Sequence, residues 1–268
     1  LMAPADLEAI FRDVPPHRPL LAANFQVDKS YKHINEHVKP VWEGKVGNVK
    51  VGVIGLTTND FLYKWRLGKG GKISSEVKVA KKWARYLRDR GNEVIIALTH
   101  IGIKKDKNLA KEVPEIDVIV GGHSHTDVFD VIWQKTGKDK MVPIVQAGNH
   151  GEWLGKLNLD YDRKTKRVSV VDYKLLPVNG EDKCPDMENL VADANEELNR
   201  EYGEEWLNEV VGHSTLRPLN EVDNSKIWHY FIADSMKEST GADFAISVAP
   251  MSGHNYPRGE VTRRALYE

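Results

Sequence analysis

The chain has 268 residues, of which 41% are hydrophobic and 29% are charged, so it can form one large domain or two ordinary ones around buried cores. Its 38 lysines and arginines nearly balance its 39 aspartates and glutamates, which argues against a general binding surface for nucleic acid or an anionic membrane. One cysteine, Cys184, excludes an internal disulfide, and no apolar run reaches the roughly 20 residues of a membrane span. A small anionic substrate would therefore need a local binding site, such as metal ions.

Over the first 150 residues, apolar runs typical of strands alternate with patterns typical of helices. Strands are predicted at residues 19–25, 94–98, 117–120 and 143–147, and a hairpin that leads into another strand is predicted at 46–56. Helices are predicted at residues 74–90, with a serine cap and a glycine stop, and at 106–113. Apolar strands separated by helices are typical of an α/β fold whose sheet is covered on both faces.

The second half of the chain changes character. Residues 154–161 and 168–175 alternate apolar and polar side chains, which predicts an antiparallel hairpin with one solvent-exposed face. Residues 186–209 form a charged helical pattern that we interpret as a connector, and an amphipathic helix at 224–240 precedes a short strand at 243–248. These features divide the chain into residues 1–180, a linker and connector helix at 181–209, and residues 210–268.

Three histidines follow two of the predicted strands. His100 comes after VIIALT, and His123 and His125 come after DVIVGG. Ligands of α/β proteins bind at the carboxyl ends of the strands, so these side chains stand where chemistry is expected. Gly121 and Gly122 are expected to let the backbone turn sharply.

Imidazole groups suit zinc, iron, manganese, nickel and copper. The imidazoles of His123 and His125 could converge on one metal or diverge toward two. A single histidine at a strand end is more often a packing or hydrogen-bonding residue, whereas three at adjacent strand ends favour a metal site. From spacing alone, both interpretations stay open.

Longer motifs carry a family resemblance. The segment at residues 98–126, LTHIGIKKDKNLAKEVPEIDVIVGGHSHT, strongly resembles the calcineurin-like metallophosphoesterases, and specifically the 5′-nucleotidase family. LLAANF and VKVGVIGLTT before it, and PIVQAGNHGEWLGKLNL after it, are similar to strands of that family. Further on, WHYFIADSMKESTGADFAI is similar to the opening of the family's C-terminal domain.

The resemblance implies a fold and a set of ligands. The fold would be the second half of a four-layer α/β/β/α sandwich, followed by a connector helix and the start of an α+β substrate-binding domain. His100 and His123 would bind the second of two divalent metals, zinc or manganese, and His125 would bind the first. The family's other ligands lie in D-x-H, G-D and G-N-H-[DE] motifs that are expected upstream of residue 1, so the chain is interpreted as an inactive fragment.

The resemblance also implies hydrolysis of phosphate monoesters, with nucleotides as the substrate and a periplasmic or extracellular location. One departure leaves the substrate open. The family's N-x-G-G-x-R substrate loop is replaced by SVAPMSGHNYPRG at residues 247–259, where His254 and Asn255 are candidate substitutes. The alternatives are a thiosulfohydrolase-like relative with the same metals and a non-catalytic binding protein on the same fold.

Two other motifs resemble known sites less well. GNH at residues 148–150 spells the start of G-N-H-[DE], but it follows the G-G-H-S-H block and Gly151 replaces the acid. HINEH at residues 33–37 spells a zinc-peptidase motif, but Pro40 follows closely and the family resemblance places the segment in a loop. Neither segment is expected to bind a metal.

Overall fold

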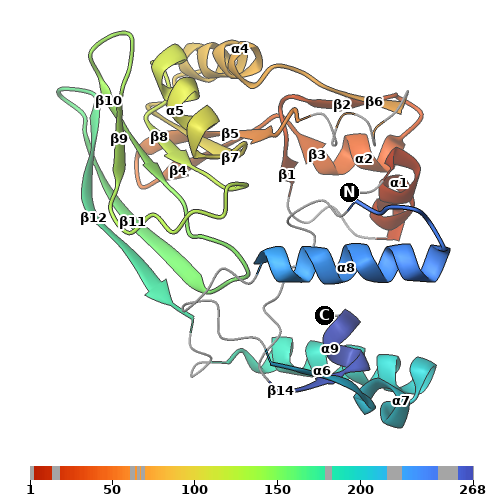
Figure 1. Cartoon of the computed structure of the whole chain (residues 1–268). Helices are drawn as coiled ribbons and strands as arrows, with labels where there is room; N and C mark the ends of the chain where they lie inside the picture. The colour runs from red at the N-terminus through yellow and green to blue at the C-terminus, as the bar shows by residue number, and fades with distance from the viewer. Residues whose placement is uncertain are drawn as a thin grey trace. The chain divides into compact units, whose positions relative to one another are not determined.

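The computed structural model describes residues 3–13, 19–60, 64, 67, 70–178, 183–215, 225–246 and 259–267. These residues belong to two compact units, Leu1–Asn179 and Gly180–Glu268, each of which is considered by itself. The first unit, whose helices and strands are labelled in Figure 1, contains the three histidines in its sequence. None of the described helices is both long and apolar enough to cross a membrane.

The first unit combines four described helices with twelve strands. The helices are α1 (Pro4–Asp13), α2 (Lys32–His37), α4 (Glu76–Asp89) and α5 (Ile103–Glu112). The strands are β1 (Leu20–Leu21), β2 (Phe25–Val27), β3 (Val38–Lys39), β4 (Val41–Val46), β5 (Val49–Thr57), β6 (Gly71–Ile73), β7 (Val94–His100), β8 (Val118–Val120), β9 (Ile132–Lys135), β10 (Met141–Val145), β11 (Trp153–Asp162) and β12 (Arg167–Pro177).

A six-stranded mixed sheet forms the centre of this unit, in the order β4-β5-β7-β8-β10-β9. The four inner strands run parallel to one another, and each edge strand is antiparallel to the inner strand beside it. Between β7 and β8, Leu98 pairs with Val120, so the two strands end side by side. This mixed sheet confirms the α/β fold that the sequence predicts.

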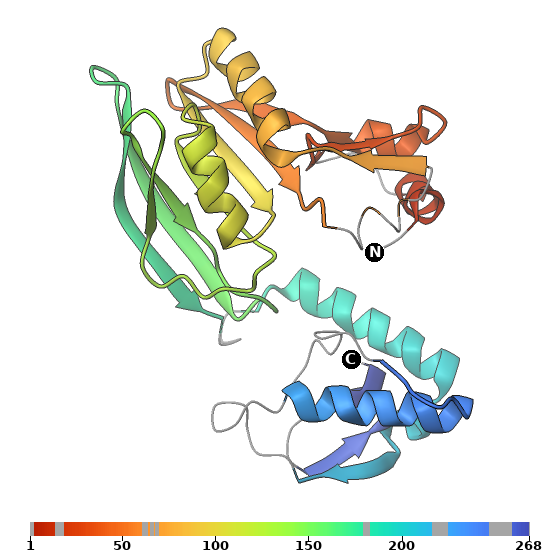
Figure 2. The ribbon, with the colours of Figure 1, turned by 45° about the horizontal axis from the view of Figure 1, so that its top comes forward.

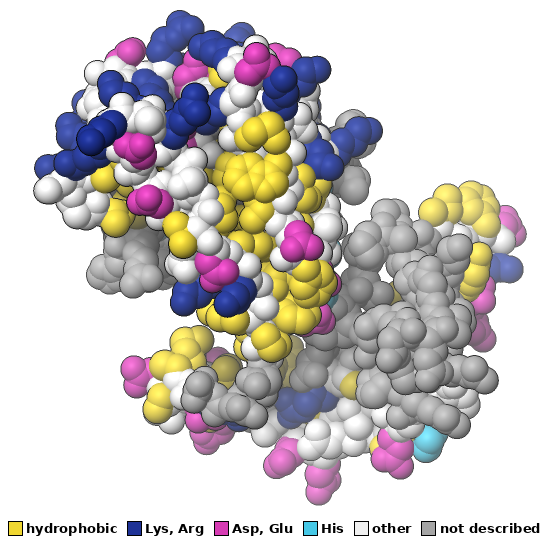
Figure 3. Space-filling view, turned by 90° about the vertical axis from the view of Figure 1, so that its left-hand side faces the viewer, with side chains coloured by type: hydrophobic (Ala, Val, Ile, Leu, Met, Phe, Trp, Pro, Cys, Tyr) yellow, Lys and Arg dark blue, Asp and Glu magenta, His cyan; other side chains and the backbone are white. Residues whose placement is uncertain are grey.

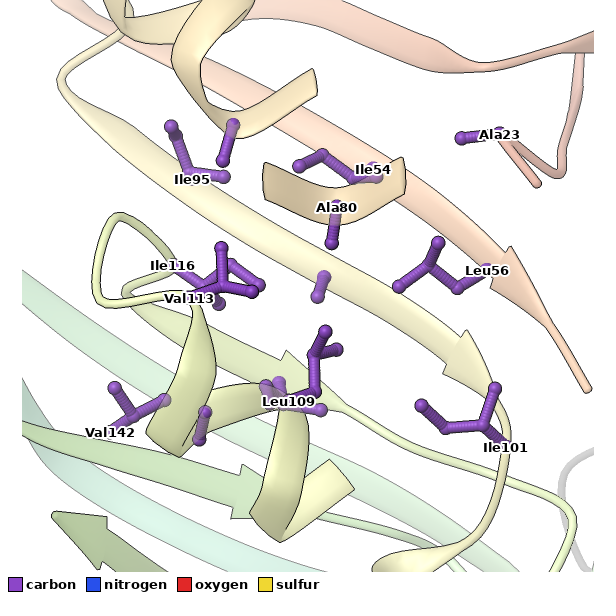
Figure 4. Close-up of a cluster of buried hydrophobic side chains, with 14 of the residues drawn as sticks. Ala23, Ile54, Leu56, Ala80, Ile95, Ile101, Leu109, Val113, Ile116 and Val142 are labelled. Atoms are coloured by element: carbon purple, nitrogen blue, oxygen red, sulfur yellow. The ribbon is translucent and has the colours of Figure 1, made fainter. Parts of the chain in front are cut away.

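Helices α4 and α5 pack on the same face of the sheet (Figure 2). They connect successive parallel strands, as crossover helices do. Their buried side chains interdigitate with those of the inner strands (Figure 4), including Ala80, Ala84, Leu87, Leu109, Ile54, Ile95, Ala97 and Ile144. Leu98 alternates to the opposite face, where it is 48% exposed, but Val51, Val118 and Val145 on that same face are buried. Side chains on both faces of the inner strands are therefore buried.

Several elements lie where periodicity predicts them. The hairpin β4–β5 turns at Gly47, whose φ is +57°, and α4 ends just before Gly91, whose φ is +82°. The predicted serine cap is only positional, because Ser75 stands at the cap of α4 without a side-chain hydrogen bond to it. Helix α5 begins three residues earlier than predicted.

The predicted strand at residues 19–25 is wrong. The chain forms two short strands there, β1 and β2, which are separated by residues 22–24. The Asn24 amide donates to the carbonyl oxygens of Thr57 (2.7 Å) and Ser74 (3.2 Å), and its oxygen accepts from the Thr57 N–H (2.9 Å). These side-chain bonds replace the regular ladder, so the strand is interrupted.

The hairpin β11–β12 confirms the prediction of an antiparallel pair, with a register shift between Asn158 and Leu159. Its exposed face is less polar than predicted, since Leu154 and Val171 are exposed. Figure 3 views the molecule from this side and shows hydrophobic side chains gathered there, with lysines and arginines across the upper edge.

The second unit contains α6 (Pro185–Tyr202), α7 (Glu204–Asn208), β13 (Val210–Ser214), α8 (Ser225–Thr240), β14 (Gly259–Thr262) and α9 (Arg263–Tyr267). The connector is therefore not one helix over residues 186–209, because Gly203, with φ +87°, separates α6 from α7. Strands β13 and β14 pair antiparallel. The predicted strand at 243–248 is not formed over residues 243–246, and its last two residues lie outside the described ones.

A glycine in β5 tests how tightly β1 packs on the central sheet. A Cβ at Gly55 would lie 2.1 Å from the carbonyl oxygen of Leu21, which is backbone and cannot move aside cheaply. We expect Gly55→Ala to lower the free energy of unfolding by about 1–3 kcal/mol. The matched control is Gly137→Ala, whose Cβ would meet only the Lys111 oxygen at 3.6 Å. Equal denaturant midpoints for the two variants would contradict the packing argument.

Candidate metal-binding histidine site

The parallel pairing of β7 with β8 brings two of the predicted ligands together. His100 is the last residue of β7, and His123 lies three residues beyond the end of β8. Their ring centroids are 5.0 Å apart, with an angle of 66° between the ring planes. The prediction that these strand ends meet is therefore correct.

His125 has a neighbour that the sequence analysis set aside. Its ring centroid lies 6.3 Å from that of His150, which follows β10, the next strand of the sheet. The GNH motif is thus part of the neighbourhood of the site, although its order differs from that of the family motif. Three successive inner strands, β7, β8 and β10, each contribute a histidine to the same edge.

The sharp turns in these loops fall on the histidines themselves. The φ angles of His123 (+83°), His125 (+52°) and His150 (+53°) are positive, whereas neither Gly121 nor Gly122 has a positive φ. The positive-φ positions of this loop are therefore the histidines and not the two glycines, which are expected from the sequence to let the backbone turn and approach a ligand closely. Non-glycine residues in this region of backbone space cost on the order of 1–3 kcal/mol and cluster at functional sites.

Gly121 and Gly122 serve close packing instead. A Cβ at Gly122 would lie 3.2 Å from Nδ1 of His100, and a Cβ at Gly121 would lie 2.5 Å from Oδ2 of Asp106. The absence of side chains here lets the loop approach the end of β7 and the start of α5. Space, rather than backbone freedom, is thus what these glycines supply.

An acidic and basic pair that the sequence analysis missed adjoins His123. Oδ2 of Asp60 lies 3.1 Å from Nε2 of His123, and Nζ of Lys105 donates to Oδ1 of Asp60 at 2.7 Å. The hydrogen bond from Lys105 holds the pKa of Asp60 below its usual value. Asp60 follows the end of β5, so the same strand-end rule that selects His100 could have found it.

The electrostatics of His100 favour its neutral form. Partial burial and the nearby charges of His123 and His125 lower its pKa. A neutral imidazole is the form that can coordinate a metal. The donor chemistry of the site therefore suits a metal such as zinc.

The number of donors is smaller than a complete metal centre needs. Within the part of the chain that the structure describes, no group of three or more His, Cys, Asp or Glu side chains is arranged to hold a metal ion. The ligand roles of His100, His123 and His125 therefore stay a prediction, and these residues alone supply at most part of a site. His254 and Asn255 lie outside the described residues.

The HINEH segment does form a helix, α2, rather than the loop predicted for it. Its second histidine, His37, stacks on Phe11 with ring centroids 4.8 Å apart, and Nδ1 of His37 lies 2.8 Å from the His33 carbonyl oxygen. These contacts are those of a packing residue.

One buried carboxyl group lies beneath the histidine loops. Asp106 is fully buried in the first turn of α5, where Oδ1 accepts a hydrogen bond from the Thr99 hydroxyl at 2.6 Å. Its other oxygen, Oδ2, has no hydrogen-bond partner among the described residues. Burial raises the pKa of Asp106 to about 7, although the Thr99 hydrogen bond opposes this effect.

Known proteins share both sequence and fold with this chain. No family model matches it. A snake venom 5′-nucleotidase from Gloydius brevicauda is 32% identical over 160 residues, which are 54% of this chain and 27% of that protein. A trifunctional nucleotide phosphoesterase from Bacillus subtilis is 28% identical over 230 residues, which are 81% of this chain and 15% of that protein. The chain thus spans less than a third of either relative.

Solved structures agree on the fold. A 5′-nucleotidase precursor from Thermus thermophilus has a TM-score of 0.76 at 22% identity and covers 99% of this chain, which spans 55% of that structure. A sulfate thiohydrolase from Thermus thermophilus has a TM-score of 0.54 at 19% identity, over 69% of this chain and 33% of that structure.

The sequence relatives named above are nucleotide-acting phosphoesterases, and the structural neighbours that share the fold include a phosphoesterase from Bacillus subtilis described as calcineurin-like. Within that class, many of them are 5′-nucleotidases, which confirms the family resemblance seen in the sequence.

The raised pKa of Asp106 makes a prediction about stability and pH. The folded state binds this proton more tightly than the unfolded state, so the contribution of the protonated form is present below about pH 4 and is lost as pH rises through about 7. Asn imitates the protonated form, so we expect Asp106→Asn to gain stability relative to the parent between pH 5 and pH 8. The gain should be about 1–3 kcal/mol, the cost of one unpaired buried polar atom.

Urea unfolding of the metal-free chain, in the presence of a chelator, measures this difference at both pH values. Asp117→Asn is the control, because both oxygens of that buried carboxylate are paired. A pH-independent difference between Asp106→Asn and the parent would contradict the assignment.

Proposed function

We propose that the complete protein hydrolyses phosphate monoesters, with nucleotides as its substrate class. The observation that carries this proposal is that His100, His123 and His125 lie together at the carboxyl ends of parallel strands. The sequence relatives of the chain include 5′-nucleotidases. The names of the curated relatives, which include a nucleotide phosphoesterase, support the substrate class.

We further propose that two divalent metals, zinc or manganese, complete the site. His100 and His123 would ligate one metal and His125 the other. Two bound cations lower the pKa of a coordinated water and neutralise charge on the transferred phosphoryl group. The described residues on their own hold no group of three donors. The remaining ligands would therefore come from groups outside them.

The residues of this chain would act by supplying and orienting imidazole donors. Partial burial keeps His100 neutral and ready to donate its lone pair. Asp60, itself held by Lys105, contacts Nε2 of His123 and fixes the direction of that ring in the absence of metal. His123 and His125 have positive φ angles, and the loop that carries them is hydrogen-bonded to the Gln146 side chain.

Removing one imidazole should separate metal binding from folding. In the complete protein, we expect His100→Ala to weaken Zn²⁺ binding on the order of 100-fold or more and to abolish release of phosphate from adenosine monophosphate. Chelator competition measures the affinity. His213→Ala, at an exposed position of β13, is the control and should keep both properties. Unchanged Zn²⁺ affinity in His100→Ala would refute the ligand assignment.

The polypeptide of residues 1–268 should not be a phosphatase by itself. It contributes imidazole donors, but its described residues hold no group of three ligands, and one or two donors bind a cation weakly. We expect no release of phosphate from adenosine monophosphate or p-nitrophenyl phosphate when Zn²⁺ or Mn²⁺ is added. Metal-dependent turnover by this polypeptide would show that it completes the site alone.

The substrate and location are further proposals. The sulfate thiohydrolase shares only its fold with this chain at 19% identity, so nucleotides are preferred over sulfur esters, and a thiosulfonate arm in the assay tests that preference. A substrate role for His254 and Asn255 stays a prediction. We propose a periplasmic or extracellular location, which the venom source of one relative supports.

A further inference from the structure

Two buried aspartates in the first unit differ in how well they are paired. Asp117 has a side chain that is 5% exposed, and its oxygens accept hydrogen bonds from Arg88, Lys140 and the Ile95 N–H. Asp106 is more deeply buried, yet only Oδ1 has a partner, the Thr99 hydroxyl. Leaving a buried polar atom unpaired lowers the stability of the folded state. An apolar residue at position 106 would avoid that cost.

The contacts of Asp106 lie between the two histidine-bearing strand ends. Thr99, which donates to Oδ1, directly precedes His100. On the other side, Oδ2 lies against Gly121, where a Cβ would come within 2.5 Å of it. The carboxyl group therefore touches the end of β7 through a hydrogen bond and the end of β8 through close packing.

Gln146 fixes the same loop from the opposite side. Its Nε2 donates to the Gly122 carbonyl oxygen at 3.2 Å, and its Oε1 accepts from the Thr126 N–H at 2.7 Å and from the Ser124 hydroxyl at 3.1 Å. Gln146, which directly follows β10, thus holds the loop that carries His123 and His125 through hydrogen bonds. The same loop packs against Asp106 of α5.

We propose that Asp106 is a positioning residue that sets the separation of His100 and His123 and thereby the affinity of the site for a divalent cation. The proposal rests on the proposed function, since it assumes that these two histidines are ligands. Asp106 contacts neither imidazole in any described hydrogen bond, so it acts through Thr99 and the Gly121 backbone. Outer-shell partners of metal ligands commonly alter metal affinity about 10- to 100-fold.

The test uses Zn²⁺ as the probe and the complete protein. Asp106→Ala removes the hydrogen bond from Thr99 and the unpaired carboxyl oxygen without enlarging the side chain, so it should weaken Zn²⁺ binding at least 10-fold. Thr99→Val, which is nearly isosteric, removes the same hydrogen bond from the other side and should weaken binding in parallel. Asp106→Asn retains an acceptor for Thr99 and should restore affinity to within about threefold of the parent.

The matched control is Asp117→Asn, which alters another buried aspartate, near the opposite ends of the same strands. Asp117→Asn should lower the unfolding midpoint and leave the Zn²⁺ affinity within twofold of the parent. If the role of Asp106 is purely structural, the Zn²⁺ affinity should instead fall with the unfolding midpoint in every variant. Parental affinity in both Asp106→Ala and Thr99→Val would overturn the proposal. If His100→Ala also binds Zn²⁺ normally, the proposed function fails with it; if only His100→Ala is impaired, the positioning role alone is wrong.

Discussion

The parallel register of β7 and β8 is the constraint on which the site depends. Leu98 pairs with Val120, so the carboxyl ends of the two strands lie side by side. The ring centroids of His100 and His123, which follow these two residues, are 5.0 Å apart. A slip of this register by two residues would displace one strand end by about 7 Å relative to the other. The crossover helix α5, packed on the core by Leu109 and Ala110, maintains the alignment.

The edge of the sheet that carries the histidines also holds features that lower the stability of the fold. Positive φ angles at three histidines, and a buried carboxyl oxygen without a partner among the described residues, are features that a fold optimised only for stability would avoid. The core beneath is apolar and closely packed, and it can hold these groups in place. A closely packed core under strained loops holds the side chains of a site in a fixed geometry.

Much of this arrangement follows from sequence patterns alone. Periodicity and glycine stops predict α4 and both hairpins, and strand-end position predicts that His100 and His123 meet. The patterns fail where a tertiary contact decides: Asn24 breaks a strand by bonding to two distant segments, and Asp60 reaches His123 from 63 residues away. Gly203 ends α6 within a charged segment that the sequence pattern predicts to be one continuous helix. The charge pattern of a segment does not reveal a single residue with a positive φ.

The contact between Gly121 and Asp106 has a consequence for how relatives of this chain can diverge. The two positions share one small volume, so neither can enlarge by itself: an alanine at 121 would collide with the carboxyl group at 2.5 Å. Such an exchange becomes tolerable only when residue 106 shortens at the same time, for example to serine. Aligned sequences should therefore show a larger residue at position 121 only where the residue 15 positions before it is smaller than aspartate.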